Sequence, residues 1–167
     1  MSYFAAVLTR SGRGWACVEV DLADCESIAD LADVTRDVAG DLRLLVIEQD
    51  DEYMAIVRIG GDDDGDDTAR AFLSDGHAAD AYPLAAMIAE DLEEIGENEH
   101  LDEEIIGEAL PSHDSSPFGD AEIVDDLGTS AAELLGMCAH EGTLPIDILV
   151  AVCEKAGCAD AFEGVRA

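Results

Sequence analysis

The sequence predicts an α+β protein, in which an N-terminal ββαβββ antiparallel sheet with helix packing is followed by a helical C-terminal part. Short apolar runs separated by turn residues fill most of the first 73 residues, whereas the last third has the period of helices. Hydrophobic residues make up 49% of the chain and the mean hydropathy is +0.07, which is enough for a packed core. Aromatic residues make up only 5%, so we expect the core to consist of Leu, Ile, Val and Ala.

Turn and capping residues predict the first two strands and the first helix. The apolar residues 3–8 and 15–20 flank a turn at 11–14 that contains two glycines, and this pattern is typical of a β-hairpin. Apolar residues then recur at helical spacing over 28–38, after a stretch of helix-start residues, and Gly40 ends the run. The chain is therefore expected to open with a hairpin and one helix.

Three further strands are expected after this helix. Residues 44–47 form a continuous apolar run, which suits a central strand buried on both faces. A reversal at 49–52 leads to a strand at 53–59, and a loop of glycines and acids at 60–67 precedes a short strand at 71–73. The order ββαβββ indicates an antiparallel sheet with a helix on one face.

The middle of the chain is the most acidic part. Asp75 is a suitable N-cap for a helix that Pro83 interrupts, and a second helical piece continues to about Leu92. Nine of the fifteen residues over 90–104 are acidic, with apolar residues between them, so this stretch is either a highly charged helix or an ordered loop. Prolines and serines over 110–119 predict a loop or linker.

The last third has clear helix boundaries. Thr129-Ser130 caps a helical run that Gly142 ends, and Pro145 stands in the first turn of the next helix, where its missing N–H is harmless. Residues 146–156 are apolar on most sides, so this helix is buried either against the sheet or against a partner.

These elements divide the chain into three parts. Residues 1–90 form the expected sheet domain, residues 91–119 an acidic segment and linker, and residues 120–167 a helical C-terminal region. Alternatively, the first and last parts together form one domain.

Charge is the unusual property of this chain. Forty acidic residues stand against eight Lys and Arg, which gives a formal net charge of −32 at pH 7. No Lys or Arg occurs over 71–154, a span that carries 21 acidic residues. Such a surface repels phosphate backbones and anionic lipid, so we expect no direct nucleic-acid or membrane binding. The acidic surface either only solubilises the protein or binds a basic partner.

Cysteine usage and the start of the chain indicate a reducing compartment. The five cysteines form no CxxC pair, and three of them lie in apolar segments. The chain opens without a signal-peptide pattern, and no window approaches the roughly 18 apolar residues of a membrane span. We therefore expect a cytoplasmic protein.

Motifs of known active and metal sites fail on spacing. Counted from Asp62, the acidic cluster 62–67 has Asp67 at the sixth position and Leu73 at the twelfth, where an EF-hand calcium loop requires glycine and glutamate, so a solvated loop is favoured over weak cation binding. Cys138 and His140 are two residues apart on an expected helix, so they diverge and cannot share a metal. Residues 112–114 have the types of a hydrolase triad, but neighbours in a loop point apart. We expect no catalytic residue, no metal, no cofactor and no enzyme.

Patterns of core and turn residues resemble the actinobacterial tRNA adenosine deaminase-associated protein family. They comprise residues 2–8, 14–15, 72–75, 126–128, 134–138 and 144–145, with Phe162 and Arg166 near the end. The resemblance implies a gene neighbour of the tRNA-editing deaminase and carries over no catalytic residues. The chain is not itself a zinc deaminase, because it has neither an H-x-E nor a P-C-x-x-C element.

The leading hypothesis is a non-catalytic binding or regulatory protein for a basic partner, such as the tRNA adenosine deaminase that the resemblance suggests. The alternatives are a salt-adapted, solubilised domain without a charge-dependent partner, or a small enzyme with an unrecognised site. The candidate partner-binding residues are Glu90, Asp91, Glu93, Glu94, Glu97, Glu99, Asp102, Glu103, Glu104, Asp120, Glu122, Asp125 and Asp126.

Overall fold

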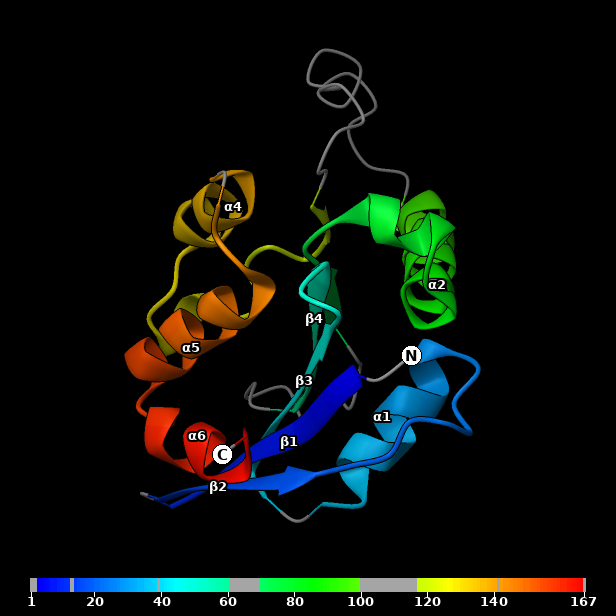
Figure 1. Cartoon of the computed structure of the whole chain (residues 1–167). Coiled ribbons are helices and arrows are strands. Elements are labelled where there is room, and N and C mark those ends of the chain that lie inside the picture. The colour runs from blue at the N-terminus through cyan, green and yellow to red at the C-terminus, as the bar shows by residue number, and fades with distance from the viewer. Residues whose placement is uncertain are drawn as a thin grey trace.

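A central antiparallel sheet has helices on both faces (Figure 1). The computed structural model describes residues 3–12, 14–38, 40–60, 70–99, 117–140 and 142–166. The strands in these ranges are β1 (Tyr3–Ser11), β2 (Gly14–Glu19), β3 (Leu42–Gln49), β4 (Tyr53–Gly60), β5 (Arg70–Leu73) and β6 (Phe118–Gly119). The helices are α1 (Ile28–Arg36), α2 (Pro83–Glu99), α4 (Ala131–Ala139), α5 (Pro145–Ala156) and α6 (Ala159–Arg166), with 3₁₀ turns η1 (Gly76–Asp80) and η2 (Asp125–Leu127).

The predicted α+β class is confirmed. Among the described residues the strands follow the order β2-β1-β3-β4-β5-β6, and each neighbouring pair is antiparallel. Successive side chains of a strand point to opposite faces. Leu44 and Val46 accordingly belong to one apolar core, whereas Leu45 and Ile47 belong to the core on the other face. This double burial explains the continuous apolar run that predicted a central strand.

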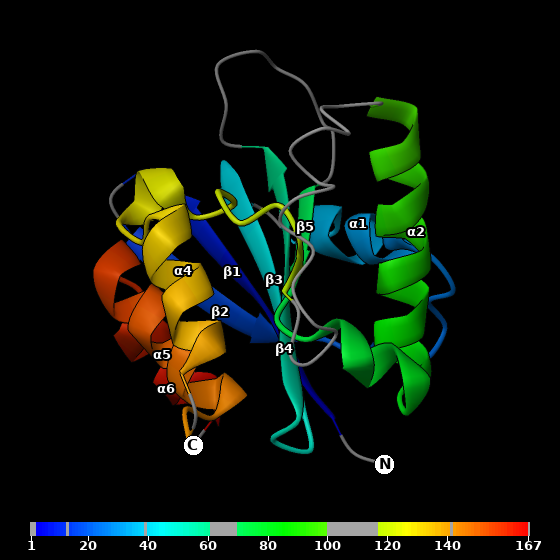
Figure 2. The same cartoon turned by 90° about the horizontal axis from the view of Figure 1, so that it is seen from above.

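One face of the sheet is covered by α1 and α2 (Figure 2). The side chain of Ser27 caps α1 by accepting a hydrogen bond from the Asp30 backbone N–H. Leu31 of α1 and Ile88 of α2 are fully buried in the core on this face. Asp91 joins the two helices, because its Oδ2 accepts a 2.6 Å hydrogen bond from the Ile28 backbone N–H.

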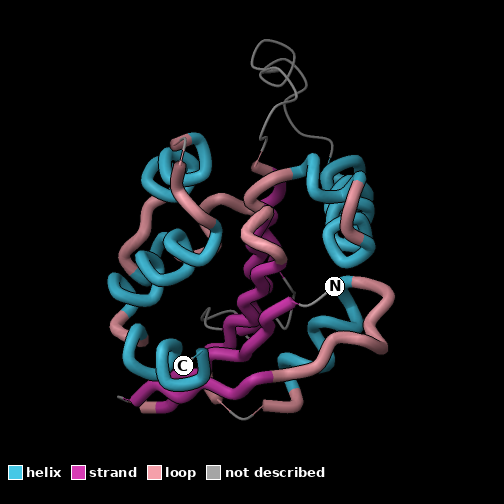
Figure 3. The backbone as a smooth tube through the Cα atoms, viewed as in Figure 1, coloured by secondary structure: helices cyan, strands magenta, loops and turns pink. Residues whose placement is uncertain are grey.

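The other face carries α4, α5 and α6, so helices flank the strands on both sides (Figure 3). The prediction that the apolar helix after Pro145 is buried is confirmed, and its buried side packs against the sheet. Leu149 and Val152 of α5 pack over β3 and β4. Phe162 of α6 makes an edge-to-face contact with Phe4, with ring centroids 5.7 Å apart.

Two elements differ from the sequence predictions. Pro83 begins α2 instead of interrupting a helix, since the preceding residues form the separate turn η1 and proline suits a first helical turn. The helix then continues beyond Leu92 to Glu99. Residues 118–119, predicted as loop, form β6, and this short strand covers the otherwise open edge of β5.

Candidate acidic binding surface

Six of the thirteen predicted partner-binding acids lie on α2. Glu90 is exposed, whereas Asp91 is partly buried and anchors the start of α1. The C-terminal half of this helix carries the next four members of the set, Glu93, Glu94, Glu97 and Glu99. The structure does not describe their side chains. The predicted acids Asp102, Glu103 and Glu104 lie outside the described residues.

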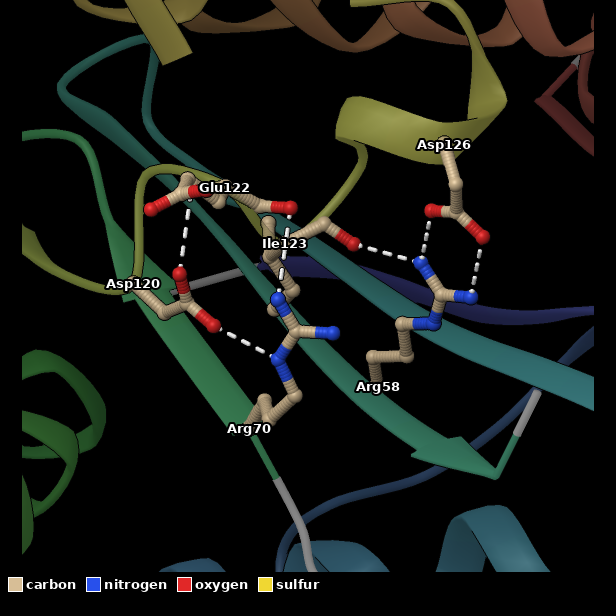
Figure 4. A network of polar contacts seen from close by, with 6 residues as sticks. All are labelled: Arg58, Arg70, Asp120, Glu122, Ile123 and Asp126. Carbon is tan, nitrogen blue, oxygen red and sulfur yellow. Dashed lines mark hydrogen bonds and ion pairs between the residues drawn. The ribbon is translucent and has the colours of Figure 1, made fainter. Parts of the chain in front are cut away.

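A buried arginine binds the half-exposed carboxylate of Asp126 (Figure 4). Its two carboxylate oxygens accept hydrogen bonds of 2.5 and 2.8 Å from the two terminal nitrogens of Arg58. The Arg58 side chain is only 1% exposed, and Nη1 also donates to the Ile123 carbonyl oxygen at 2.8 Å. The hydrogen bonds from Arg58 lower the pKa of Asp126, so the carboxylate stays ionised at neutral pH.

Asp120, six residues before Asp126, forms a second ion pair with the sheet. Arg70 Nε donates a 2.6 Å hydrogen bond to Asp120 Oδ2, while the other carboxylate oxygen accepts one from the Glu122 backbone N–H. Arg58 lies on β4 and Arg70 on β5, so the two arginines hold residues 120–126 against the sheet. Glu122 and Asp125 are exposed, and so is Asp126, whose side chain is 54% exposed although Arg58 holds its carboxylate.

Positive charge on the described surface is engaged within the chain. Each Lys or Arg whose side chain is described contacts another residue of the chain. For Arg58 and Arg70 these contacts are the ion pairs with Asp126 and Asp120. The remaining contacts are Arg36–Asp33, Lys155–Glu133, Arg43 Nε to the Val38 carbonyl oxygen, and Arg10 stacked over Trp15. The exposed carboxylates therefore dominate the electrostatic potential.

The turn between β3 and β4 carries exposed carboxylates at residues 50–52, which the sequence analysis did not include among the candidate binding residues. Asp50 and Asp51 both have positive φ angles, of 52° and 59°, which Asp tolerates better than most residues. The Asp51 backbone N–H donates to the Glu48 carboxylate at 2.9 Å, which fixes the turn. Burial raises the pKa of Tyr53, and the nearby Tyr82 and the carboxylates of Asp50 and Glu48 raise it further. The run of three acids at 50–52 could have indicated this acidic site from the sequence, but we interpreted it only as a chain reversal.

Depressions lie on either side of this acidic turn. One, of about 300 Å³, is lined by Tyr3 and Phe4 together with acids of the turn. The other, of about 220 Å³, has Asp51, Glu52 and Asp75 on one side and the end of α4 on the other. Neither has a lysine or arginine among its described lining residues, so both favour cationic groups.

The thiols have the environment of buried apolar groups. Burial raises the pKa values of Cys17 and Cys138 to about 11, so both are protonated at neutral pH. Cys153 and Cys158 are each 1% exposed in the core beneath α6. Within the described ranges no group of three or more His, Cys, Asp or Glu is arranged to hold a metal ion. The acidic residues 62–67 and residues 112–114, considered above as candidate sites, lie outside the described residues.

The fold and this surface define a class: an α+β protein with helices on both faces of an antiparallel sheet and a carboxylate-rich exterior. The chain belongs to the Rv3753c-like tRNA adenosine deaminase-associated protein family, whose sequence profile matches residues 3–159. The family predicted from the sequence is thereby confirmed. No curated protein and no solved structure matches the chain significantly. Along the described parts of the chain, no helix has both the length and the apolar character needed to cross a bilayer.

Proposed function

We propose that this protein is a non-catalytic accessory protein that binds the tRNA adenosine deaminase through its acidic surface. The observation that carries the proposal is the imbalance of exposed charge. Carboxylates such as Glu90, Glu122 and Asp125 face solvent, while the described basic side chains make contacts within the chain. A surface of this kind attracts a cationic macromolecule and repels an anionic one.

The deaminase supplies the complementary chemistry. An enzyme that binds tRNA needs a cationic face, because affinity for the phosphate backbone comes from lysines and arginines that displace counterions. The family description names an association with this enzyme. Docking of an acidic protein on that face would be steered by electrostatics and weakened by salt. The same complementarity predicts that tRNA and this protein compete for the deaminase.

Size-exclusion chromatography of the two purified proteins tests the proposal. We expect them to elute together at low potassium chloride and separately at high potassium chloride, and we expect added tRNA to displace this protein. Separate elution at low salt would show that the deaminase is not the partner.

A charge-matched pair of variants shows whether the location of the charge matters. The test variant carries Glu90→Gln, Glu122→Gln and Asp125→Asn, whereas the control carries Glu19→Gln, Asp41→Asn and Asp160→Asn. All six residues are exposed, and each variant removes three negative charges. The proposal predicts that only the test variant weakens association. Equal weakening would indicate a diffuse charge effect without a defined surface.

A second function is favoured by one feature of the composition. The chain has one lysine and seven arginines against forty acids, which is typical of proteins adapted to high salt. A salt-adapted domain without a charge-dependent partner should gain thermal stability strongly as potassium chloride rises. A melting temperature that changes little with salt would leave the accessory role as the explanation of the charge.

A further inference from the structure

An apolar stripe on α4 faces solvent. Its members are Ala132, Leu135, Gly136 and Ala139, which follow the i, i+3, i+4, i+7 spacing of one helix face, and all four are exposed. Leu135 is 40% exposed, whereas Leu134, on the other side of the helix, is fully buried. The helix thus has a second apolar face besides the one that packs against the core.

Gly136 in the middle of this stripe has no packing explanation within the described chain. A Cβ atom added there would meet no other atom within 4 Å. Glycine inside a helix is less favourable than alanine by about 1 kcal/mol. Glycine is useful at such a position where another backbone approaches closely, and Gly136 leaves space for such an approach on this face.

The stripe leads into the acidic depression of about 220 Å³ beside the β3–β4 turn. Ala139, the last residue of the stripe, lines this depression together with Asp51, Glu52 and Asp75. The carboxylates lie near the C-terminal end of α4, where the helix dipole also favours positive charge. Apolar and anionic surfaces therefore meet at Ala139.

We propose that the α4 stripe and this depression together form a docking groove for a cationic amphipathic helix of a partner protein. The partner's apolar side chains lie along Leu135 and Gly136, and a lysine or arginine enters the depression beside Asp51. From residue 132 to residue 139 the stripe is about 10 Å long, which matches two turns of a docked helix. The groove rests on the proposed function, since it gives the deaminase a specific place to bind.

Charge selects this occupant over a second copy of the chain. Two copies each carry a formal net charge of −32 and repel each other, whereas a cationic helix is attracted to the same groove. Analytical ultracentrifugation provides the check. The protein should stay monomeric, and a dimer that Leu135→Gln abolishes would show that a second copy occupies the groove and would overturn the proposal.

The first test uses a synthetic peptide and does not depend on the deaminase. A Leu/Lys amphipathic peptide of about 15 residues, long enough to form a helix, is titrated calorimetrically into the full-length protein. We expect saturable binding that falls about tenfold in Leu135→Gln and in Gly136→Gln. The control is Val18→Gln, because Val18 is 45% exposed on β2, away from the groove. Equal affinities of all variants, or no binding, would overturn the groove.

The second test repeats the titration with the purified deaminase. If the deaminase binds wild type and Val18→Gln but binds Leu135→Gln and Gly136→Gln about tenfold more weakly, the groove is its docking site. If all forms bind equally, the groove inference fails while the proposed function stands. If the deaminase binds none of them, the proposed function fails, and the peptide titration alone decides whether the groove exists.

Discussion

Arg58 and Asp126, 68 residues apart in the chain, form a bidentate ion pair with nitrogen–oxygen distances of 2.5 and 2.8 Å. The arginine is 1% exposed and the aspartate 54% exposed, so the pair is buried on one side only. Together with Arg70 and Asp120 it holds the 120–126 segment on the sheet. Two of the acids that the sequence analysis proposed for partner binding are therefore ion-paired within the fold.

Removing Asp126 should destabilise the protein more than removing Asp120. Asp126→Ala removes the carboxylate that accepts two hydrogen bonds from the buried Arg58 guanidinium, which we expect to lower the free energy of unfolding by about 2–3 kcal/mol. Asp120→Ala breaks a partly exposed pair and should cost about 1 kcal/mol. Urea denaturation of both variants measures the difference. Equal losses would show that the burial of Arg58 carries no special energetic weight.

The contribution of Asp126 should depend on pH with a defined sign. Its folded-state pKa lies below the ordinary value because the arginine holds the ionised form. Its stabilisation is therefore fully present above the unfolded pKa of about 3.9 and is lost as the pH falls through the folded pKa. The difference in unfolding free energy between wild type and Asp126→Ala should be constant near neutrality and shrink in acid. A difference that grows in acid contradicts this assignment.

Gly136→Ala should stabilise the isolated protein. Open space surrounds the position and the backbone is helical, so alanine adds helix propensity without a clash. We expect a gain of about 0.5–1 kcal/mol in the free energy of unfolding, seen as a higher melting temperature. Gly128→Ala is the contrasting variant and should destabilise, because Gly128 has a φ of +112° and lies against the Lys155 backbone. A loss of stability in Gly136→Ala would mean that the glycine is needed within the chain.

Cys17 and Cys138 should react slowly with iodoacetamide in the folded protein. Their pKa values of about 11 leave little thiolate at pH 8, and the rate should still be rising with pH above pH 9. Mass spectrometry of the alkylated peptides gives the rate at each site. The control is denatured protein, in which the thiol pKa is about 8.5. A plateau near pH 9 in the folded state would contradict the burial of these thiols.

Local features of the fold were predictable because local chemistry determines them. Alternation and turn residues predicted the β1–β2 hairpin. The helix-start residues before residue 28 and the pair Thr129-Ser130 predicted helix starts that the structure confirms. The start of α2 was missed because Pro83 both starts helices and breaks them. The two-residue strand β6 has no pattern of its own and exists only through pairing with β5.

The candidate surface was less predictable, because it depends on contacts distant in sequence. Asp120 and Asp126 look like any other acid along the chain, and only the fold reveals that arginines on β4 and β5 engage them. In the other direction, Asp51 and Asp75 are 24 residues apart and meet at one depression through the antiparallel pairing of β4 with β5. The density of acids was visible in the sequence, but their distribution over the surface was not.

The central claim is that exposed carboxylates bind the basic face of the tRNA adenosine deaminase, and its most direct test is the affinity of that complex over a potassium chloride series. Isothermal titration calorimetry should show tight binding at low salt, a steep loss as salt rises, and a weaker salt dependence for the Glu90→Gln, Glu122→Gln, Asp125→Asn variant. An affinity that does not change with salt, or no binding at the lowest salt, would contradict the claim.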